Sequence, residues 1–274
     1  EPEIDMAALI SWKDGIVERL NRGVESLLAS AGVEIIHGWA KFSGPKNCVV
    51  GSGNKKIEIE AENVIIATGS SHIDLPFMPC DEKNIISSTG ALDLQKLPKK
   101  IAIVGGGYIG VELGCAFAKL GSKVSIIEGM DSILGIFDRE LRRPLEIWLK
   151  KNGVDVHTKS LALGAEVKGK GAAKKVDLTF QKDGEEITHR VDKVLVTVGR
   201  KSNIDNCGIE NTGVRMDSSG RFIRIDRQCR TNVPGVYAIG DVSGEPMLAH
   251  RASSQGEMVA EIIAGHVRDF DKVA

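Results

Sequence analysis

The chain has 274 residues, which suffices for a sizeable core and about two domains, and its 42% hydrophobic and 27% charged residues exclude a disordered or fibrous protein. A net charge of -1 gives no electrostatic reason to expect a nucleic acid or an anionic membrane surface as partner. No apolar run approaches the roughly 20 residues of a membrane span and no signal peptide is recognisable, so we expect a cytoplasmic protein whose partners are small molecules and proteins.

The N-terminal part of the chain predicts one long helix followed by short strands. Apolar residues recur at helical spacing between residues 6 and 31, and Gly32 is placed to stop this helix, whose expected role is packing. The β-rich runs VEIIHG, NCVVGSGN and KIEIEAENVIIATG then predict a small sheet that closes on a buried strand at 63–67. A proline-rich loop follows at 72–98 and contains the helix-cap signature Ser88-Thr89.

The most informative segment starts at residue 101. The apolar strand IAIV runs into a glycine turn, GGGYIG at 105–110, which opens a helix through Gly121, and the strand KVSIIE then ends in Glu128, 18 residues after Gly110. This order of strand, turn, helix, strand and acid is the context that a dinucleotide site requires. The alternative, a plain glycine turn before a helix, explains the spacing and the acid less well.

Each glycine of the turn has an expected role. Gly105 makes the tight bend, Gly107 lets the backbone approach a diphosphate, and Gly110 lets the helix pack on the strand. Glu128 would accept hydrogen bonds from both ribose hydroxyls and repel a 2'-phosphate, and residues 129–131 supply no cation. We therefore expect NAD rather than NADP; the alternative is that Glu128 is a solvated strand end.

The rest of this domain continues the alternation of strands and helices with one exception. A helix from Asp138 to Asn152 contains Pro144, which must kink it or mark its first turn, and the strand VDVHT follows. Residues 161–190 then show β-type runs where a simple doubly wound domain would have a helix, and KVLVTVG returns to Arg200. We therefore predict an α/β fold, a Rossmann-like domain with a β-meander crossover.

The cysteines form no close pair. Any two of them lie at least 22 residues apart, at Cys48, Cys80, Cys115, Cys207 and Cys229. Each is expected to be a buried small hydrophobe or a plain thiol, and the sequence predicts neither a disulfide nor a metal site.

Four motifs occur in the order and at the separations of a known family: IIATGSS at 65–71, GGGYIGVELG at 105–114, TVGR at 197–200 and YAIGDV at 237–242. On these the chain resembles the pyridine nucleotide disulfide oxidoreductases. LAHRASSQG at 248–256, HGWAKF and GEPMLAHR resemble the dihydrolipoamide dehydrogenase branch, of the type that serves branched-chain 2-oxo acid complexes.

The resemblance implies a flavoprotein with FAD and NAD as cofactors. The NAD-binding domain, 95–216, would be inserted in an incomplete FAD-binding domain of the same architecture, 1–94 and 217–274. The implied activity is oxidation of dihydrolipoyl groups with NAD as acceptor, with lipoyl domains of a 2-oxo acid dehydrogenase complex as partners and a homodimer as the assembly.

The resemblance also implies site residues. Those expected at the flavin are Ala40, Thr68, Gly69, Ser70, Asp241, Met247, Leu248, Ala249 and His250. Those expected at the nicotinamide nucleotide are Gly105, Gly106, Gly107, Tyr108, Ile109, Gly110, Val111, Glu112, Glu128, Val167 and Gly199. Tyr108 could cover the flavin until nicotinamide arrives, and Glu112 could contact the carboxamide. Asp241 could instead be an ordinary helix cap, and His250 an ordinary surface or core histidine.

The chain lacks three parts of the family's machinery: the Cys-x-x-x-x-Cys pair, the first FAD glycine loop and the C-terminal His/Glu pair. We therefore expect no catalytic residue in it and an inactive fragment of a longer enzyme. The alternatives are an NAD-binding module without catalysis of its own and another FAD- and NADH-linked oxidoreductase, such as an NADH oxidase.

Overall fold

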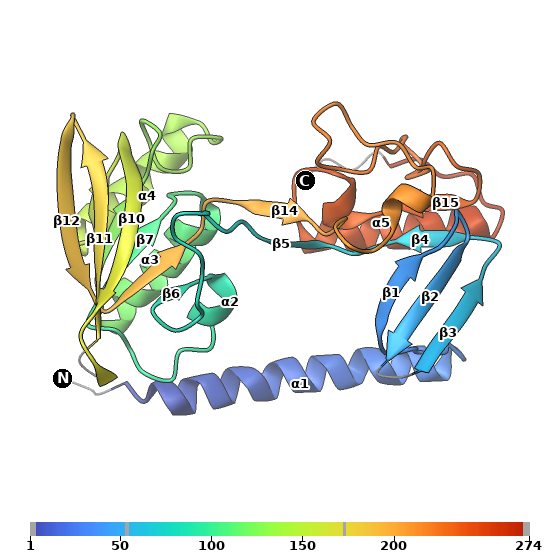
Figure 1. Ribbon diagram of the computed structural model, residues 1–274, viewed down its shortest axis with the longest axis horizontal. Helices are drawn as coiled ribbons and strands as arrows, with labels where there is room; N and C mark the ends of the chain where they lie inside the picture. The colour runs from blue at the N-terminus through green and yellow to red at the C-terminus, as the bar shows by residue number, and fades with distance from the viewer. Residues whose placement is uncertain (1–3, 53–54, 172–173, 271–274) are drawn as a thin grey trace. The chain divides into compact units, whose positions relative to one another are not determined.

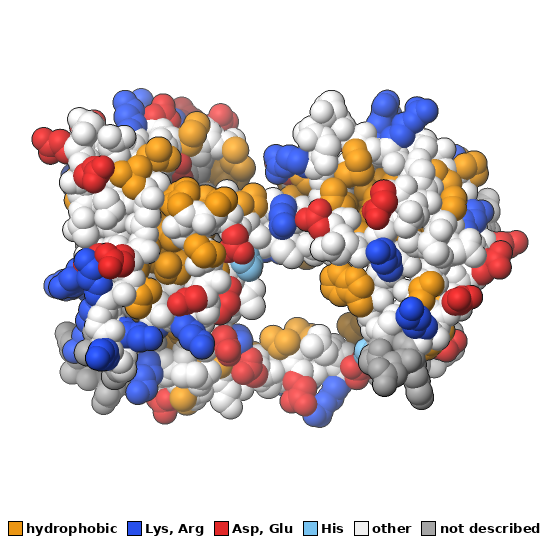
Figure 2. Space-filling model, in the orientation of Figure 1, with side chains coloured by type: hydrophobic (Ala, Val, Ile, Leu, Met, Phe, Trp, Pro, Cys, Tyr) orange, Lys and Arg blue, Asp and Glu red, His pale blue; other side chains and the backbone are white. Residues whose placement is uncertain are grey.

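The computed structural model describes residues 4–52, 55–171 and 174–270 and divides into two compact units (Figure 1). Unit 1 comprises residues 1–28 and 72–199, and unit 2 comprises residues 29–71 and 200–274. On the face shown in Figure 2, acidic and basic side chains are interspersed without an extended patch of one sign. Within the described ranges, no helix is long and apolar enough to cross a bilayer.

Unit 1 is built on a five-stranded parallel sheet with the order β6-β13-β7-β8-β9. The strands are β6 (Ile85–Ile86), β7 (Lys100–Val104), β8 (Lys123–Ile127), β9 (Asp155–His157) and β13 (Lys193–Val196). Helix α3 (Tyr108–Leu120) connects β7 to β8, and α4 (Arg139–Lys151) connects β8 to β9. Near-continuous apolar runs form β6, β7, β8 and β13 because both faces of the sheet are covered. The predicted α/β fold is confirmed.

The two faces of this sheet bury alternate residues of the same strands. Val104 and Ile127 belong to one core cluster, together with Val176, Leu178 and Phe180 of the crossover. Ile103 and Ile126 belong to the other cluster, which contains residues of α3 and α4. This is the two-residue period of a strand, and each fully buried aliphatic side chain contributes about 1.5 to 3 kcal/mol.

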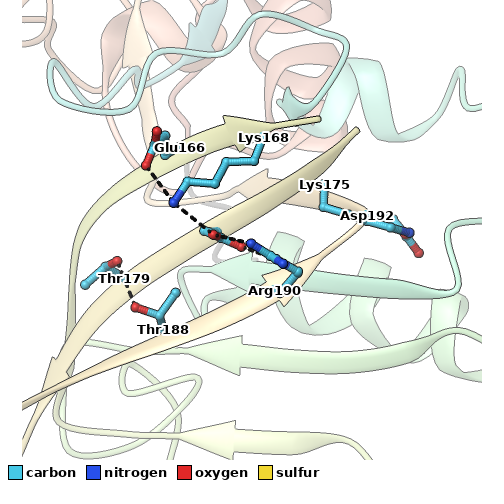
Figure 3. A network of polar contacts seen from close by, with 8 residues as sticks. Glu166, Lys168, Lys175, Thr179, Thr188, Arg190 and Asp192 are labelled. Atoms are coloured by element: carbon cyan, nitrogen blue, oxygen red, sulfur yellow. Dashed lines mark hydrogen bonds and ion pairs between the residues drawn. The ribbon is translucent and has the colours of Figure 1, made fainter. Parts of the chain in front are cut away.

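The crossover between β9 and β13 is the predicted meander, an antiparallel sheet of β10 (Ser160–Lys168), β11 (Lys175–Lys182) and β12 (Glu185–Val191). Its polar contacts form the network shown in Figure 3. Arg190 binds Asp177 with two hydrogen bonds of 2.7 and 2.9 Å, and Lys168 lies 3.3 Å from the same carboxylate. The hydrogen bonds from Arg190 are the main reason that the pKa of Asp177 is lowered to about 2.

Local signals place the helix ends of unit 1 with small differences from the prediction. Helix α2 (Ser88–Ala91) is capped by Ser87, one residue earlier than the predicted pair, because the Ser87 hydroxyl accepts from the N–H of Thr89 at 3.1 Å. Helix α3 ends at Gly121 with φ +104°, as predicted. Helix α4 starts at Arg139 and continues through Pro144, so this proline does not mark the first turn of the helix.

Unit 2 contains a three-stranded antiparallel sheet, β1 (Trp39–Phe42), β2 (Asn47–Ser52) and β3 (Lys55–Glu60). Strand β4 (Val64–Ile66) pairs in parallel with β15 (Val236–Ala238), which leads into the 3-10 helix η3 (Gly240–Ser243) and then helix α5 (Ala249–Ile263). The short 3-10 helix η2 (Ile209–Asn211) lies between β4 and β15 in the sequence. Strands β5 (Ser70–His72) and β14 (Arg200–Ser202) pair with each other where the chain passes between the units.

Two expectations for the N-terminal part were wrong, and a third was correct only in part. Helix α1 (Met6–Ser30) was expected to pack, but only Met6 and Ile10 are buried, and Leu20 and Leu27 are 65% and 70% exposed. The run VEIIHG forms no strand in the part of the chain that is described, and the predicted buried strand at 63–67 is shortened to β4, in which Ile65 is 40% exposed. Apolar patterning alone does not make a strand, which also needs a neighbouring backbone to pair with.

Candidate cofactor site

The glycine turn between β7 and α3 lies at the carboxyl end of the parallel sheet. Gly105 has φ +106°, a left-handed conformation that favours glycine, and its N–H donates to Ile127 O at 2.9 Å. A Cβ on Gly105 would lie 2.5 Å from Thr197 O, and one on Gly110 would lie 2.1 Å from Gly105 O. Neither position has room for a side chain, so the turn and the helix pack closely, as predicted.

Gly107 differs from these two glycines because the space beside it is open. A Cβ there would meet no atom within 4 Å, and the residue is exposed with an ordinary φ of -72°. It forms the N-cap of α3, whose first N–H groups have no partner inside the helix. An anionic group placed here would be held by these N–H groups and by the positive end of the helix dipole.

Glu128 lies beside this turn and is held in a fixed orientation. One carboxylate oxygen accepts from Gly106 N–H at 2.6 Å, and the other accepts from Met130 N–H at 2.7 Å. The residue is half-buried, so it is not a free, solvated strand end. Each carboxylate oxygen has a further lone pair, so Glu128 can still accept from a ligand's hydroxyls.

Thr197 was quoted within a motif but was not predicted as a site residue. It follows β13, the neighbour of β7 in the sheet, and its hydroxyl donates to Gly105 O at 2.9 Å and to Val104 O at 3.2 Å. It therefore fixes the glycine turn from the adjacent strand. The hydroxyl-bearing residue after the returning strand was the available signal, but the strand order was needed to see its partner.

The other residues expected on the nicotinamide side lie on three elements of unit 1. Tyr108, 43% exposed, and Glu112 are both exposed on α3, four residues apart and hence on one face. Val167 is on β10 and is partly exposed, and Gly199 follows β13 with φ +129°. Val111 is buried in the core between the sheet and α3, and Ile109 is half-buried.

In unit 2 the structure brings together two residues that were predicted for the flavin. Ser70 donates its hydroxyl hydrogen to Asp241 at 2.5 Å, although the two residues are 171 positions apart. Arg200, not predicted as a site residue, donates to the Ser70 hydroxyl at 2.7 Å and to the Ser70 carbonyl at 2.6 Å. Asp241 lies in the first turn of η3 but makes no capping bond there, which disfavours the helix-cap interpretation.

The preceding residues of this segment are held by Asn203. Its N–H donates to Gly69 O and its side chain donates to Thr68 O, both at 2.9 Å, and Gly69 has φ +69°. The remaining predicted flavin residues lie on two further elements: Ala40 is exposed on β1, and 247–250 are half-buried or exposed where α5 begins. His250 is exposed, so a core role is excluded.

All five cysteines are free thiols, as expected. Burial is the main cause that raises the pKa of the thiols of Cys115 and Cys207, and it raises the pKa of Cys229 to about 11. Burial and then a hydrogen bond with Asp74 raise the pKa of Cys80 to about 12. These four thiols are therefore protonated at neutral pH and are poor nucleophiles.

Two relatives named dihydrolipoyl dehydrogenase match the whole chain. The protein from Pseudomonas aeruginosa is 44% identical over 276 residues, covering 100% of this chain and 57% of that protein. The protein from Geobacillus stearothermophilus is 44% identical over 271 residues, covering 99% of this chain and 56% of that protein. The chain thus spans little more than half the length of these relatives.

Solved structures show the same fold. The HOCl-induced flavoprotein disulfide reductase RclA from Escherichia coli has a TM-score of 0.83 and 26% identity, covering 98% of this chain and 60% of that chain. LpdA from Mycobacterium tuberculosis has a TM-score of 0.85 and 26% identity, covering 98% of this chain and 58% of that chain. Both similarities cover 98% of this chain and therefore extend over both units.

The family profile described as pyridine nucleotide-disulphide oxidoreductase matches residues 2–256. That range includes the glycine turn, Glu128 and the Ser70–Asp241 contact described above. The chain therefore belongs to the pyridine nucleotide-disulphide oxidoreductase family.

Proposed function

We propose that this chain carries the NAD-binding part of a dihydrolipoamide dehydrogenase, an enzyme that oxidises dihydrolipoyl groups with NAD as acceptor. The observation that carries the proposal is the Glu128 carboxylate, held by Gly106 N–H at 2.6 Å next to the open space at Gly107. An acid that accepts ribose hydroxyls and a helix start that accepts a diphosphate are the two recognition elements of an NAD site.

For NAD, the residues of unit 1 take defined roles. The turn at 105–110 holds the diphosphate, Glu128 holds the adenosine ribose, and Val167 and Gly199 line the adenine and nicotinamide ribose ends. Tyr108 and Glu112, exposed on one face of α3, flank the nicotinamide. Glu128 gives specificity for NAD because its negative charge repels a 2'-phosphate.

For FAD, the Ser70–Asp241–Arg200 cluster of unit 2 is suited to a ribityl chain. The Asp241 carboxylate can accept hydrogen bonds from the ribityl hydroxyls, and the Arg200 guanidinium holds Ser70 in place. Thr68, Gly69, Ala40 and 247–250 would complete the contacts to the flavin. When bound, FAD supplies the electron transfer between thiols and nicotinamide. This chain's own residues bind and orient; none of them is proposed as an acid, base or thiol nucleophile.

The domain organisation belongs to the same proposal. From the motifs, we place the NAD-binding domain at 95–216 and parts of the FAD-binding domain at 1–94 and 217–274. The compact units divide the chain differently, after residues 28, 71 and 199, so β6 lies with the proposed NAD-binding part and η2 with the proposed FAD-binding part. The whole enzyme would be a cytoplasmic homodimer whose partners are lipoyl domains of a 2-oxo acid dehydrogenase complex. The name of the relatives, dihydrolipoyl dehydrogenase, supports the substrate.

A second candidate is an NAD-binding module without catalysis of its own, or an NADH oxidase of the same family. This second candidate is supported by the five cysteines of the chain, which include no Cys-x-x-x-x-Cys pair. Electron transfer to a lipoyl disulfide proceeds through such a pair in the proposed enzyme class.

Calorimetric titration of the purified chain with NADH and with NADPH tests the proposal. We expect saturable binding of one NADH per chain and at least about tenfold weaker binding of NADPH, because Glu128 repels the 2'-phosphate; tenfold corresponds to about 1.4 kcal/mol. Binding of NADPH as tight as that of NADH would contradict the role given to Glu128. Lack of binding by either nucleotide would contradict the NAD site itself.

A further inference from the structure

Three metal-ligating side chains of unit 1 converge outside the cofactor residues. A ring nitrogen of His72, a carboxylate oxygen of Asp74 and the Sγ atom of Cys80 all lie within 4.8 Å of one another. His72 Nε2 and Asp74 Oδ1 are 3.6 Å apart. We refer to these three residues as the His72–Asp74–Cys80 cluster. His72 and Cys80 are half-buried and Asp74 is exposed, so the cluster is reachable from solvent.

The loop that carries the cluster is already closed on itself. Asp74 Oδ1 accepts from the backbone N–H of Cys80 at 3.0 Å, which joins the two ends of the loop. Between them, Met78 N–H donates to Leu75 O at 2.8 Å, and the Met78 side chain is buried in the core with 1% exposure. The donor groups are therefore brought together by the fold, and a ligand would not have to order the loop itself.

The charge around the cluster favours a cation. The carboxylates of Asp74, Glu82 and Asp81 all act electrostatically on the Cys80 thiol. Asp81 also closes the next turn by accepting from the N–H groups of Lys83 at 2.9 Å and Asn84 at 2.6 Å, which keeps its negative charge in place. A divalent ion would be attracted by this field and would stabilise the thiolate that it binds.

We propose that the His72–Asp74–Cys80 cluster binds a divalent transition-metal ion of the zinc class. Zinc takes nitrogen, oxygen and sulfur ligands at about 2.0 to 2.3 Å in a tetrahedron, which places the ligand atoms about 3.5 Å from one another. The His72–Asp74 distance of 3.6 Å meets this spacing, and the outer limit of 4.8 Å requires an approach of about 1 Å from the flexible ends of the side chains.

The donor set also selects the ion. Calcium and magnesium need about six oxygen ligands, whereas one imidazole, one carboxylate and one thiolate suit zinc or cobalt. Three protein ligands leave the fourth position to water. Binding forms the metal–sulfur bond and releases the Cys80 thiol proton to the buffer.

Cobalt(II) and zinc(II) titrations of the untagged 274-residue chain, kept reduced with a phosphine, test this site. We expect one zinc ion per chain and, with cobalt, the near-ultraviolet absorption band of a thiolate ligand. Cys80→Ser should abolish that band, and Cys80→Ser and His72→Asn should each weaken zinc binding more than about tenfold. Cys115→Ser, at another half-buried thiol of unit 1, is the matched control and should change neither result.

Two features keep the outcome decisive. The His157–His189 ring pair, 5.1 Å between centroids, contains no thiol and cannot produce the cobalt band, so binding there is distinguishable. The cobalt spectrum of the wild-type chain tests the site even if a variant fails to fold. Absence of the thiolate band, absence of saturable zinc binding, or equal loss in Cys115→Ser would overturn the proposal and leave the cluster as a hydrogen-bonded loop closure.

Discussion

Single side chains of this protein act mainly by closing backbone turns. Glu128 accepts hydrogen bonds from the N–H groups of Gly106 and Met130. Thr197 joins the glycine turn to the neighbouring strand through its hydroxyl. Asp81 does the same in the loop before β6, where it accepts from three successive N–H groups. At such positions a charged side chain contributes to stability through charge-assisted hydrogen bonds to nearby backbone N–H groups.

Replacing Glu128 with alanine should weaken NADH binding by about 1 to 3 kcal/mol, because the ribose hydroxyls lose their acceptor and the turn loses its hydrogen bond. NADPH binding should suffer less, so the preference between the two nucleotides should narrow. Isothermal titration calorimetry with both nucleotides measures this. Asp131→Asn, three residues further on and exposed, is the control and should leave both affinities unchanged; an equal effect of the two substitutions would contradict the assignment.

Stability should depend on pH through Asp81. Partial burial raises the pKa of this carboxyl, but hydrogen bonds from the Asn84 side chain and from three backbone N–H groups outweigh burial and lower the pKa from the ordinary 3.8 to about 2. A lowered folded-state pKa stabilises the fold above the unfolded value and loses that contribution as pH falls. Because Asp81 is exposed and solvent screens its charge, Asp81→Ala should cost no more than about 1 kcal/mol at neutral pH, and the difference from wild type should shrink between about pH 4 and pH 2.

Urea unfolding of wild type, Asp81→Ala and the exposed control Asp93→Asn across this range tests the prediction. A difference between wild type and Asp81→Ala that stays constant down to pH 2 would show that the charge of Asp81 does not contribute.

At the scale of elements, the turn between β7 and α3 contains both tightly packed positions and positions of the proposed NAD site within six residues, 105–110. Gly110 is enclosed by Gly105 O and Thr197 Oγ1, and Gly107 faces open space. The same residue type is thus required at one position by the protein's own atoms and at the other by the proposed ligand.

Gly110→Ala and Gly107→Ala should consequently affect different properties, the first stability and the second NADH binding. The methyl group of Gly110→Ala would lie 2.1 Å from Gly105 O, so we expect a loss of about 1 to 3 kcal/mol in the free energy of unfolding. Gly107→Ala should change stability by less than about 0.5 kcal/mol, yet weaken NADH binding because the methyl group enters the space for the diphosphate. Thermal unfolding and calorimetry measure the two effects, and equal destabilisation by both variants would be incompatible with this division of roles.

At the scale of the whole molecule, the two units differ in the cofactor-binding features that they contain. Unit 1 contains a glycine turn, a helix start and an acid in one place. Unit 2 offers the Ser70–Asp241–Arg200 cluster, but the sequence has one GxGxxG loop, at 105–110, and it belongs to unit 1.

We therefore expect the chain as given to bind NAD(H) but to retain no FAD and to reduce no lipoamide. Tight binding of FAD requires its diphosphate to be held at a helix start, and the remaining contacts are too few to offset the ordering of so long a cofactor. The absorption spectrum of the purified protein and an assay of NAD-dependent dihydrolipoamide oxidation measure the two parts. A yellow protein with bound flavin would refute the first part, and measurable oxidation would refute the second.

The fold was predictable to the extent that local patterns determine it. The sequence identified the apolar runs of β7 and β8, the turn at 105–110 and the β-type crossover. Each of them shows its periodicity or glycine spacing within a short stretch of consecutive residues. The packing of α1 and a strand at VEIIHG were predicted wrongly, since both depend on what lies opposite the apolar residues, and a single sequence does not contain that information.

The sequence by itself determined the family motifs, the α/β class and the residues of the glycine turn, because each is a property of neighbouring positions. Only the tertiary structure decided which side chains meet: Ser70 with Asp241 across 171 positions, Thr197 with Gly105 across a strand pair, and, within one short loop, His72 with Asp74 and Cys80. These contacts arise from strand order and loop closure, which depend on the burial of the whole core rather than on any local pattern. For this reason the sequence predicted no metal site, while the folded chain places three metal-ligating side chains together.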